Sequence, residues 1–234
     1  HAMPRSGSGG THRGPNIMMR HDAATGITTP VGRSGPLRGR SGVAGTSFTG
    51  VDGSINWEED RGFGTMGFAT GVSLYPTRVN CRILAQFTGT NPAGTSGSFT
   101  FQGSGTFIDA ETVLTAGHVI YMNTWTDNAG TLWTFNAFPD WCVVRAATHL
   151  GTDNWGRADG TAYWAGTGWM NNANLDADVG LIAVDRAAGM LTGWHALAFG
   201  GNCEWVEDQT FFNFSYPGEN CDDGGPLHNG LDMY

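Results

Sequence analysis

The stretch Ser-Gly-Thr-Phe-Ile-Asp-Ala-Glu-Thr-Val-Leu-Thr-Ala-Gly-His, residues 104–118, is the part of the sequence that best indicates the fold. Two short runs rich in apolar and β-branched residues, 106–108 and 112–115, are separated by the polar turn Asp109-Ala110-Glu111. This pattern predicts two strands, because no apolar spacing of three to four residues runs through it. The second run ends in Ala116 and Gly117, whose small side chains permit a tight bend that turns His118 from a strand end into a cleft.

Similar short runs recur on both sides of this stretch and are separated by turns rich in Gly, Asn, Asp and Pro. They cover residues 81–87, 98–102, 132–135, 141–147, 179–184 and 209–216. Since no long segment has helical periodicity, the sequence predicts an all-β barrel or sandwich. Residues 153–160 are rich in acids and predict a surface turn. They do not form an EF-hand loop, because Trp155 stands where that loop needs its second oxygen ligand.

Length, composition and charge limit the possible classes of protein. The chain has 234 residues, 40% of them hydrophobic, and its apolar stretches are far too short for a membrane helix. The first 40 residues hold six arginines and one acid, a charge of +5, while the remaining residues hold six arginines and twenty acids, a charge of −14. An acidic body argues against nucleic-acid binding, and we expect neither a nucleic-acid nor a membrane partner.

The N-terminal residues 1–50 are basic and rich in Gly, Pro and Ser, which predicts a flexible leader. The alternative is a pro-segment that is cleaved at Arg33-Ser34 or Arg40-Ser41. The initial His1-Ala2-Met3 has the look of a cloning remnant. Aromatic richness and the lack of lysine suggest an exported protein, and secretion is therefore the expected localisation.

Four cysteines, Cys81, Cys142, Cys203 and Cys221, allow three disulfide pairings. No Cys-x-x-Cys occurs, so we expect no zinc site, and nothing in the sequence calls for another metal or a cofactor. Cys203 and Cys221 flank a strand-like segment and could join its two ends. Free buried thiols are the other possibility, and the sequence leaves both open.

A second segment of chemical interest is Leu-Asp-Ala-Asp-Val-Gly-Leu-Ile-Ala-Val-Asp, residues 175–185. Asp178 stands at the entrance of an apolar run that predicts a buried strand. A carboxylate in such surroundings needs a partner, and an imidazole N–H would serve, which would also fix the ring's tautomer. The alternatives are that Asp178 only caps a turn with Asp176 and that His118 is a structural histidine.

Together these two segments resemble the trypsin-like, chymotrypsin-fold serine endopeptidases, and within them the glutamyl endopeptidase-like bacterial branch. Thr115-Ala116-Gly117-His118 is similar to the family's general-base histidine motif, and Asp178-Val179-Gly180-Leu181-Ile182 to its aspartate motif. Two weaker similarities, at residues 74–79 and 211–219, resemble the branch's entry into its first barrel and a Tyr-Pro-Gly turn early in its second. The order His then Asp fits this family. The resemblance covers residues 70–234.

The resemblance implies a double β-barrel with a cleft that holds His118 as the base and Asp178 as its orienting partner, acting on a polypeptide substrate. We expect the first barrel, with both residues, at 51–190 and the start of a second barrel at 191–234. The first barrel would be complete and the second only partial. A preference for glutamate is implied by the resemblance alone.

The expected nucleophile is missing, because no Gly-x-Ser-Gly follows Asp178. Asp223, in Cys-Asp-Asp-Gly-Gly-Pro, could stand in the serine's place, which would make the chain an inactive binding module. Asp223 lies only 45 residues beyond Asp178, however, and about 90 separate the two catalytic residues of chymotrypsin. Ser215 is flanked by Phe and Tyr and has no adjacent glycine, so it is no substitute.

We therefore expect the serine beyond Tyr234 or on a C-terminal companion fragment. A β-sandwich lectin that binds sugars through its tryptophans is a third possibility, which leaves the histidine motif unexplained.

Overall fold

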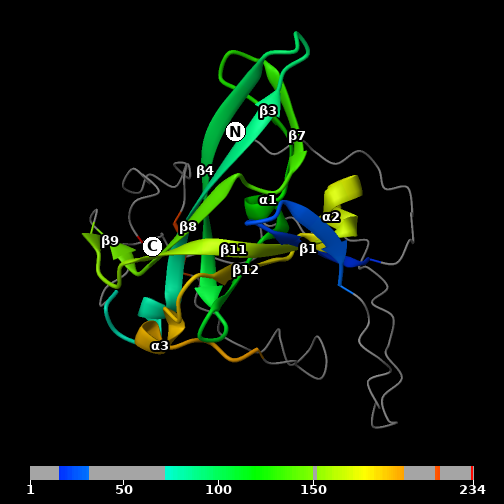
Figure 1. Cartoon of the computed structure of the whole chain (residues 1–234). Helices are drawn as coiled ribbons and strands as arrows, with labels where there is room; N and C mark the ends of the chain where they lie inside the picture. The colour runs from blue at the N-terminus through cyan, green and yellow to red at the C-terminus, as the bar shows by residue number, and fades with distance from the viewer. Residues whose placement is uncertain (1–15, 32–71, 150–151, 198–213, 217–232, 234) are drawn as a thin grey trace, which may run out of the picture.

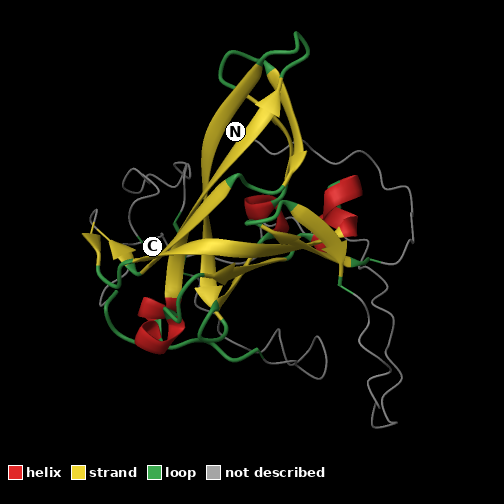
Figure 2. Ribbon diagram, viewed as in Figure 1, coloured by secondary structure: helices red, strands yellow, loops and turns green. Residues whose placement is uncertain are grey.

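The computed structural model describes residues 16–31, 72–149, 152–197, 214–216 and 233. The chain in these parts is built almost entirely from antiparallel strands, with a few helices of one or two turns (Figures 1 and 2). No described helix is long and apolar enough to cross a membrane. The strands of the main sheet are β1 (Met18–Asp22), β2 (Ile27–Pro30), β3 (Asn80–Thr90), β4 (Ser96–Phe107), β5 (Thr112–Thr115), β6 (Met122–Thr126), β7 (Leu132–Ala137), β8 (Trp141–Ala146), β11 (Arg157–Gly166) and β12 (Gly180–Val184).

Six of these strands close into a barrel. Each of the neighbours β3–β4, β4–β5, β5–β12, β12–β11, β11–β8 and β8–β3 is paired antiparallel, so the last strand returns to the first. Closure leaves no open edge within the barrel itself. The predicted all-β fold with a complete first barrel is confirmed, whereas most of residues 191–234, expected to begin the second barrel, lie outside the described residues.

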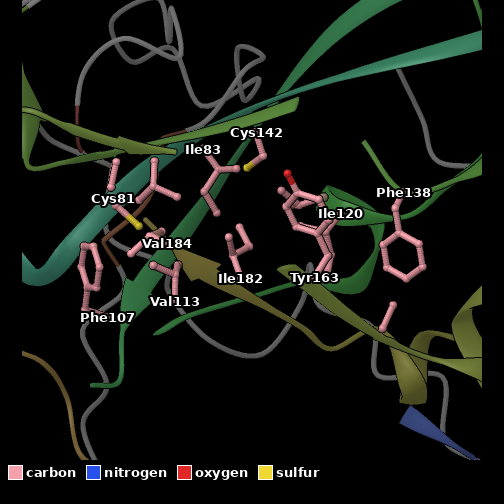
Figure 3. Close-up of a cluster of buried hydrophobic side chains, with 14 of the residues drawn as sticks. Cys81, Ile83, Phe107, Val113, Ile120, Phe138, Cys142, Tyr163, Ile182 and Val184 are labelled. Atoms are coloured by element: carbon pink, nitrogen blue, oxygen red, sulfur yellow. The ribbon is translucent and has the colours of Figure 1, made fainter. Parts of the chain in front are cut away.

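The barrel interior is a single core of apolar side chains that alternate with outward-facing ones along each strand (Figure 3). Phe107, Ile83, Val113, Ile182 and Tyr163 have no exposed surface at all. Two glycines let strands approach this core closely: a Cβ at Gly105 would lie 2.7 Å from Val113 Cγ1, and one at Gly180 would lie 2.7 Å from Ile120 Cδ1. Small residues at these points therefore set how tightly β4 and β12 pack.

Most predicted strands lie within observed ones. Residues 81–87 fall in β3, both 98–102 and 106–107 in β4, and 132–135 in β7, while the predicted run 112–115 coincides with β5. β3 and β4 extend beyond the barrel and meet β7 and β6, where Phe and Trp rings pack against one another (Figure 1). The predicted run 209–216 is a strand nowhere in its described part, 214–216, and its other residues lie outside the described chain.

Two predictions are corrected by the structure. Residues 157–160, interpreted as part of an acidic surface turn, begin β11, which pairs with β8, β12 and β1. The reason is that Ala158 and Ala162 face the core while the acidic Asp159 faces outward and is held by Asp185, so the low apolar content concealed a barrel strand.

The second correction concerns the flexible leader that was expected over residues 1–50. Within it, β1 and β2 form a hairpin, and β1 pairs with β11 over five residues, from Met18↔Gly166 to Asp22↔Ala162. The turn between the two strands is closed by Gly26, whose φ of 68° favours glycine, and by Asp22, which accepts hydrogen bonds from Thr25. Backbone pairing with β11 thus orders a segment whose composition suggests disorder.

The remaining elements are short. They are the two-stranded pair β9 (Thr148–His149) and β10 (Thr152–Asp153), the helices α1 (Gly117–Ile120), α2 (Thr167–Asn172) and α3 (Gly189–Thr192), and the 3-10 turns η1 (Thr77–Val79) and η2 (Leu175–Ala177). Of these, α1, α2 and η2 surround the candidate site (Figure 1).

Candidate active site

His118 lies on α1, a single helical turn that follows β5 directly. Ala116 has an extended backbone, φ −79° and ψ 150°, and the chain enters the helix at Gly117. Val119 and Ile120 of the same turn are buried in the barrel core, so the His118 side chain is on the outward side and is 40% exposed. The sequence predicted His118 at a strand end; the structure places it one residue further, on a helix that the strand end starts.

Asp178 lies between η2 and β12, on the strand that pairs with β5. Asn174 caps the turn, since its side-chain oxygen accepts the Asp176 N–H at 3.1 Å. The Asp178 carboxylate is therefore not needed as the cap of this turn and points to His118 instead. Its side chain is only 13% exposed. Pairing of Gly180 in β12 with Thr115 in β5 brings the two segments together, which sequence spacing alone does not determine.

The two oxygens of Asp178 bind two different nitrogens of one residue. Oδ1 accepts the backbone N–H of His118 at 2.7 Å, and Oδ2 lies 2.7 Å from the ring Nδ1. Because an ionised carboxylate can only accept, Nδ1 carries the hydrogen and Nε2 of a neutral ring has a free lone pair. The pair fixes both the orientation of the ring and its tautomer.

Gly117 leaves the space that this contact needs. A Cβ on Gly117 would lie 3.0 Å from Asp178 Oδ1 and 3.2 Å from Cδ1 and Cγ of the Trp169 ring. Both distances are shorter than ordinary van der Waals contact. The glycine before the histidine therefore has a second role beyond backbone bending, because it lets a carboxylate and an indole approach the helix turn from one side.

Trp169, on α2, is a site residue that the sequence analysis did not find. Its ring centroid lies 5.9 Å from that of His118 with the planes at 62°, an edge-to-face contact. Its Nε1–H donates to the carbonyl of Tyr121 at 2.9 Å, which holds the indole in place. No sequence signal identified Trp169 among nine tryptophans, since its position depends on where β11 ends and α2 begins.

A cavity of about 630 Å³ lies behind this tryptophan, between the N-terminal hairpin and the barrel. Its walls include His21, Tyr121, Phe138 and Met170. His21 stacks on Phe138 at 4.9 Å between centroids with the planes only 9° apart, and burial lowers the pKa of His21. Burial also raises the pKa of the Tyr121 hydroxyl, so both side chains are neutral at pH 7.

The other candidate residues have the following places. Cys81 and Cys142 are free, buried thiols in the barrel core, whereas Cys203, Cys221 and Asp223 lie outside the described residues. In the described part of the chain, no hydroxyl group hydrogen-bonds to the His118 ring. That part also contains no group of three or more His, Cys, Asp or Glu side chains that could hold a metal ion.

No family model matches this sequence, and no curated protein matches it. Three solved structures share part of its fold. A Glu endopeptidase has 18% identity and a TM-score of 0.42, covering 58% of this chain and 53% of its own. A protease from Arthrobacter nicotinovorans has 18% identity and a TM-score of 0.41, covering 66% and 64%.

The third is a thermostable serine protease from an extremophilic microorganism, with 16% identity and a TM-score of 0.41, covering 67% of this chain and 63% of its own. This chain thus spans between about half and just under two thirds of the length of these proteins. At such low identity and TM-score the likeness concerns the fold.

Proposed function

We propose that the chain provides the general base and the orienting carboxylate of a serine endopeptidase that hydrolyses peptide bonds in polypeptides. The observation that supports this most is the contact of both Asp178 oxygens with His118, at 2.7 Å each. A histidine with a purely structural role has no need of a carboxylate on its backbone and ring nitrogens together. This arrangement leaves Nε2 as the ring atom available for proton transfer.

In the proposed mechanism, Nε2 of His118 takes the proton from a serine hydroxyl as that oxygen attacks the peptide carbonyl. The imidazolium then gives this proton to the leaving amine, and the same ring later activates the water that releases the acyl group. Asp178 stays ionised throughout. It keeps Nδ1–H in place and stabilises the charged ring.

The nucleophile is proposed to lie beyond Tyr234 or on a companion fragment. The support is the spacing described above, since Asp178 is followed by only 56 residues in this sequence and no Gly-x-Ser-Gly. We also propose that the protein is secreted and that its basic leader can be cleaved at Arg33-Ser34 or Arg40-Ser41.

A fluorophosphonate probe tests this function, because it modifies only a serine activated by its base. The probe is applied to the protein produced from the natural gene, read through the codons that follow Tyr234. We expect covalent labelling of the wild type and loss of labelling in His118→Ala, while the control His195→Ala is labelled normally. If the folded wild type takes up no probe, the site is not an active peptidase. That outcome would favour an inactive binding module with Asp223 at the serine position.

A further inference from the structure

Three arginines form a row across the outer face of the barrel, away from His118. Arg82 on β3 pairs directly with Arg145 on β8, and Arg145 pairs directly with Arg157 on β11. Residues in direct cross-strand register extend from the same face of a sheet. Their chain neighbours Ile83, Val144 and Ala158 are buried in the core, so the three arginines belong to the outer face.

The charge of this row is poorly matched. Like charges directly opposite each other on neighbouring strands are unfavourable. Among the described residues one carboxylate, Asp153, pairs with the row, at 3.5 Å from Arg145. Arg82 Nη2 donates to the neutral Gln102 at 3.0 Å. The row is a concentration of positive charge on a body that is strongly acidic.

The row also has buried donors without acceptors. Arg82 is only 8% exposed, yet its Nε is buried and has no hydrogen-bond partner, and the same is true of Nε of Arg145. Burial, followed by the charge of Arg145, lowers the pKa of Arg82, which is the cost of holding this guanidinium away from water. Unpaired donors on buried cations indicate that an anionic acceptor belongs here.

The chain itself returns to this face near its C-terminal end. Tyr216 is 3% exposed, and its N–H donates to the side chain of Ser104 at 2.8 Å. Ser104 is the direct cross-strand neighbour of Arg82 on β4, so Tyr216 lies at one end of the row. Met233, fully buried, packs with Tyr216 and Ala147 in a small apolar cluster.

An acidic stretch follows Tyr216 after two residues. Residues 219–223, Glu-Asn-Cys-Asp-Asp, carry three carboxylates. Three residues of extended chain reach about 10 Å, and seven reach about 24 Å. The row crosses two strand spacings, which is about 10 Å. The acidic stretch therefore has the reach and the charge to cover all three arginines.

We propose that the Arg82–Arg145–Arg157 row is the docking surface for the acidic segment 219–223 and so fixes the start of the predicted second barrel on the first. The carboxylates accept from the guanidinium groups and balance their charge. The inference does not depend on the proposed peptidase activity, since it needs neither a serine nor a substrate.

The test uses a nitroxide spin label on Cys221, in a chain with Cys203→Ser. The remaining cysteines, Cys81 and Cys142, are buried, and burial raises the pKa of both thiols, that of Cys142 to about 12, so neither is expected to react. The mobility of the label is measured from the spectrum of the folded protein. We expect an immobilised label at low salt and a mobile one at about 1 M NaCl, where the Debye length falls to about 3 Å.

The decisive comparison is Arg157→Gln against Arg186→Gln. Arg157 is exposed, and its substitution is therefore compatible with folding. Arg186 is an exposed arginine paired with Asp185 on another part of the surface, so its substitution makes the same change of charge. We expect Arg157→Gln to raise the ratio of mobile to immobile label about 2- to 5-fold and Arg186→Gln to leave it unchanged.

A second variant, Asp223→Asn, is expected to release the label as Arg157→Gln does and to add little in the Arg157→Gln background. A label that is equally mobile in the wild type and in Arg157→Gln would overturn the proposal. It would also be overturned if sulfate or phosphate raised the Tm through Arg157 while the label stayed mobile, since the row would then hold a free anion.

Discussion

Replacing Asp178 by Asn reverses the hydrogen-bond requirement at His118. Asn can keep one oxygen on the backbone N–H of His118, but its second group is then an NH₂ that donates towards Nδ1. The ring must answer with a lone pair on Nδ1, which moves its hydrogen to Nε2. A hydrogen bond to a charged group contributes about 1.5–3 kcal/mol, so the carboxylate favours the Nδ1–H tautomer by a factor of about 10 to 100.

The assay is the ¹⁵N NMR spectrum of the His118 ring, recorded above the ordinary histidine pKa of about 6.5. The wild type is expected to show a protonated Nδ1, and Asp178→Asn a protonated Nε2. With its lone pair on the wrong nitrogen, the ring cannot act as a base. In the active protein, turnover is then expected to fall by about 10⁴, or about 5.5 kcal/mol of transition-state stabilisation.

Asp176→Asn is the matched control, since it makes the same chemical change two residues away, on an exposed side chain of η2. This variant is expected to keep the wild-type tautomer. The reasoning is refuted if Asp178→Asn retains the Nδ1–H tautomer, or if the wild type carries its hydrogen on Nε2.

Three further predictions concern stability. Gly117→Ala is expected to lower the free energy of unfolding by about 1–3 kcal/mol, because its Cβ meets Asp178 and Trp169; chemical denaturation measures it, and an unchanged midpoint would contradict it. Burial lowers the pKa of His21, so the unfolded chain binds a proton first as the pH falls below about 6.5, and stability is lost on acidification. His21→Phe should therefore flatten the decline of Tm between pH 7.5 and 5, and an identical decline would refute this. Removal of residues 1–31 uncovers the edge of β11 and should lower Tm by roughly 5 °C or more, whereas an equal Tm would show that the hairpin adds no stability.

The sequence predicted the residues whose chemistry is local and missed those that depend on strand pairing. His118 and Asp178 stand in short motifs whose neighbours, small residues before the one and an apolar strand after the other, are visible in the sequence. The strands with apolar alternation, such as β3 and β5, were predicted for the same reason.

The rest could not be predicted because its cause is tertiary. β11 is built on small residues that fit inside a closed barrel, and Ala158 and Ala162 have little β-propensity of their own. β1 is ordered by a free edge of β11 that no local pattern reveals. Trp169 contacts His118 only because α2 begins where β11 ends, and the arginine row appears only once the register of β3, β8 and β11 is known.

The most direct test of the central claim is hydrolysis of an unfolded protein substrate by the natural gene product, with the wild type and His118→Ala compared at equal concentration. The account predicts peptide-bond cleavage by the wild type and a loss of at least about 10³-fold in kcat/KM for His118→Ala, with the variant still folded. Equal cleavage by both proteins, or none by a folded wild type, would contradict it.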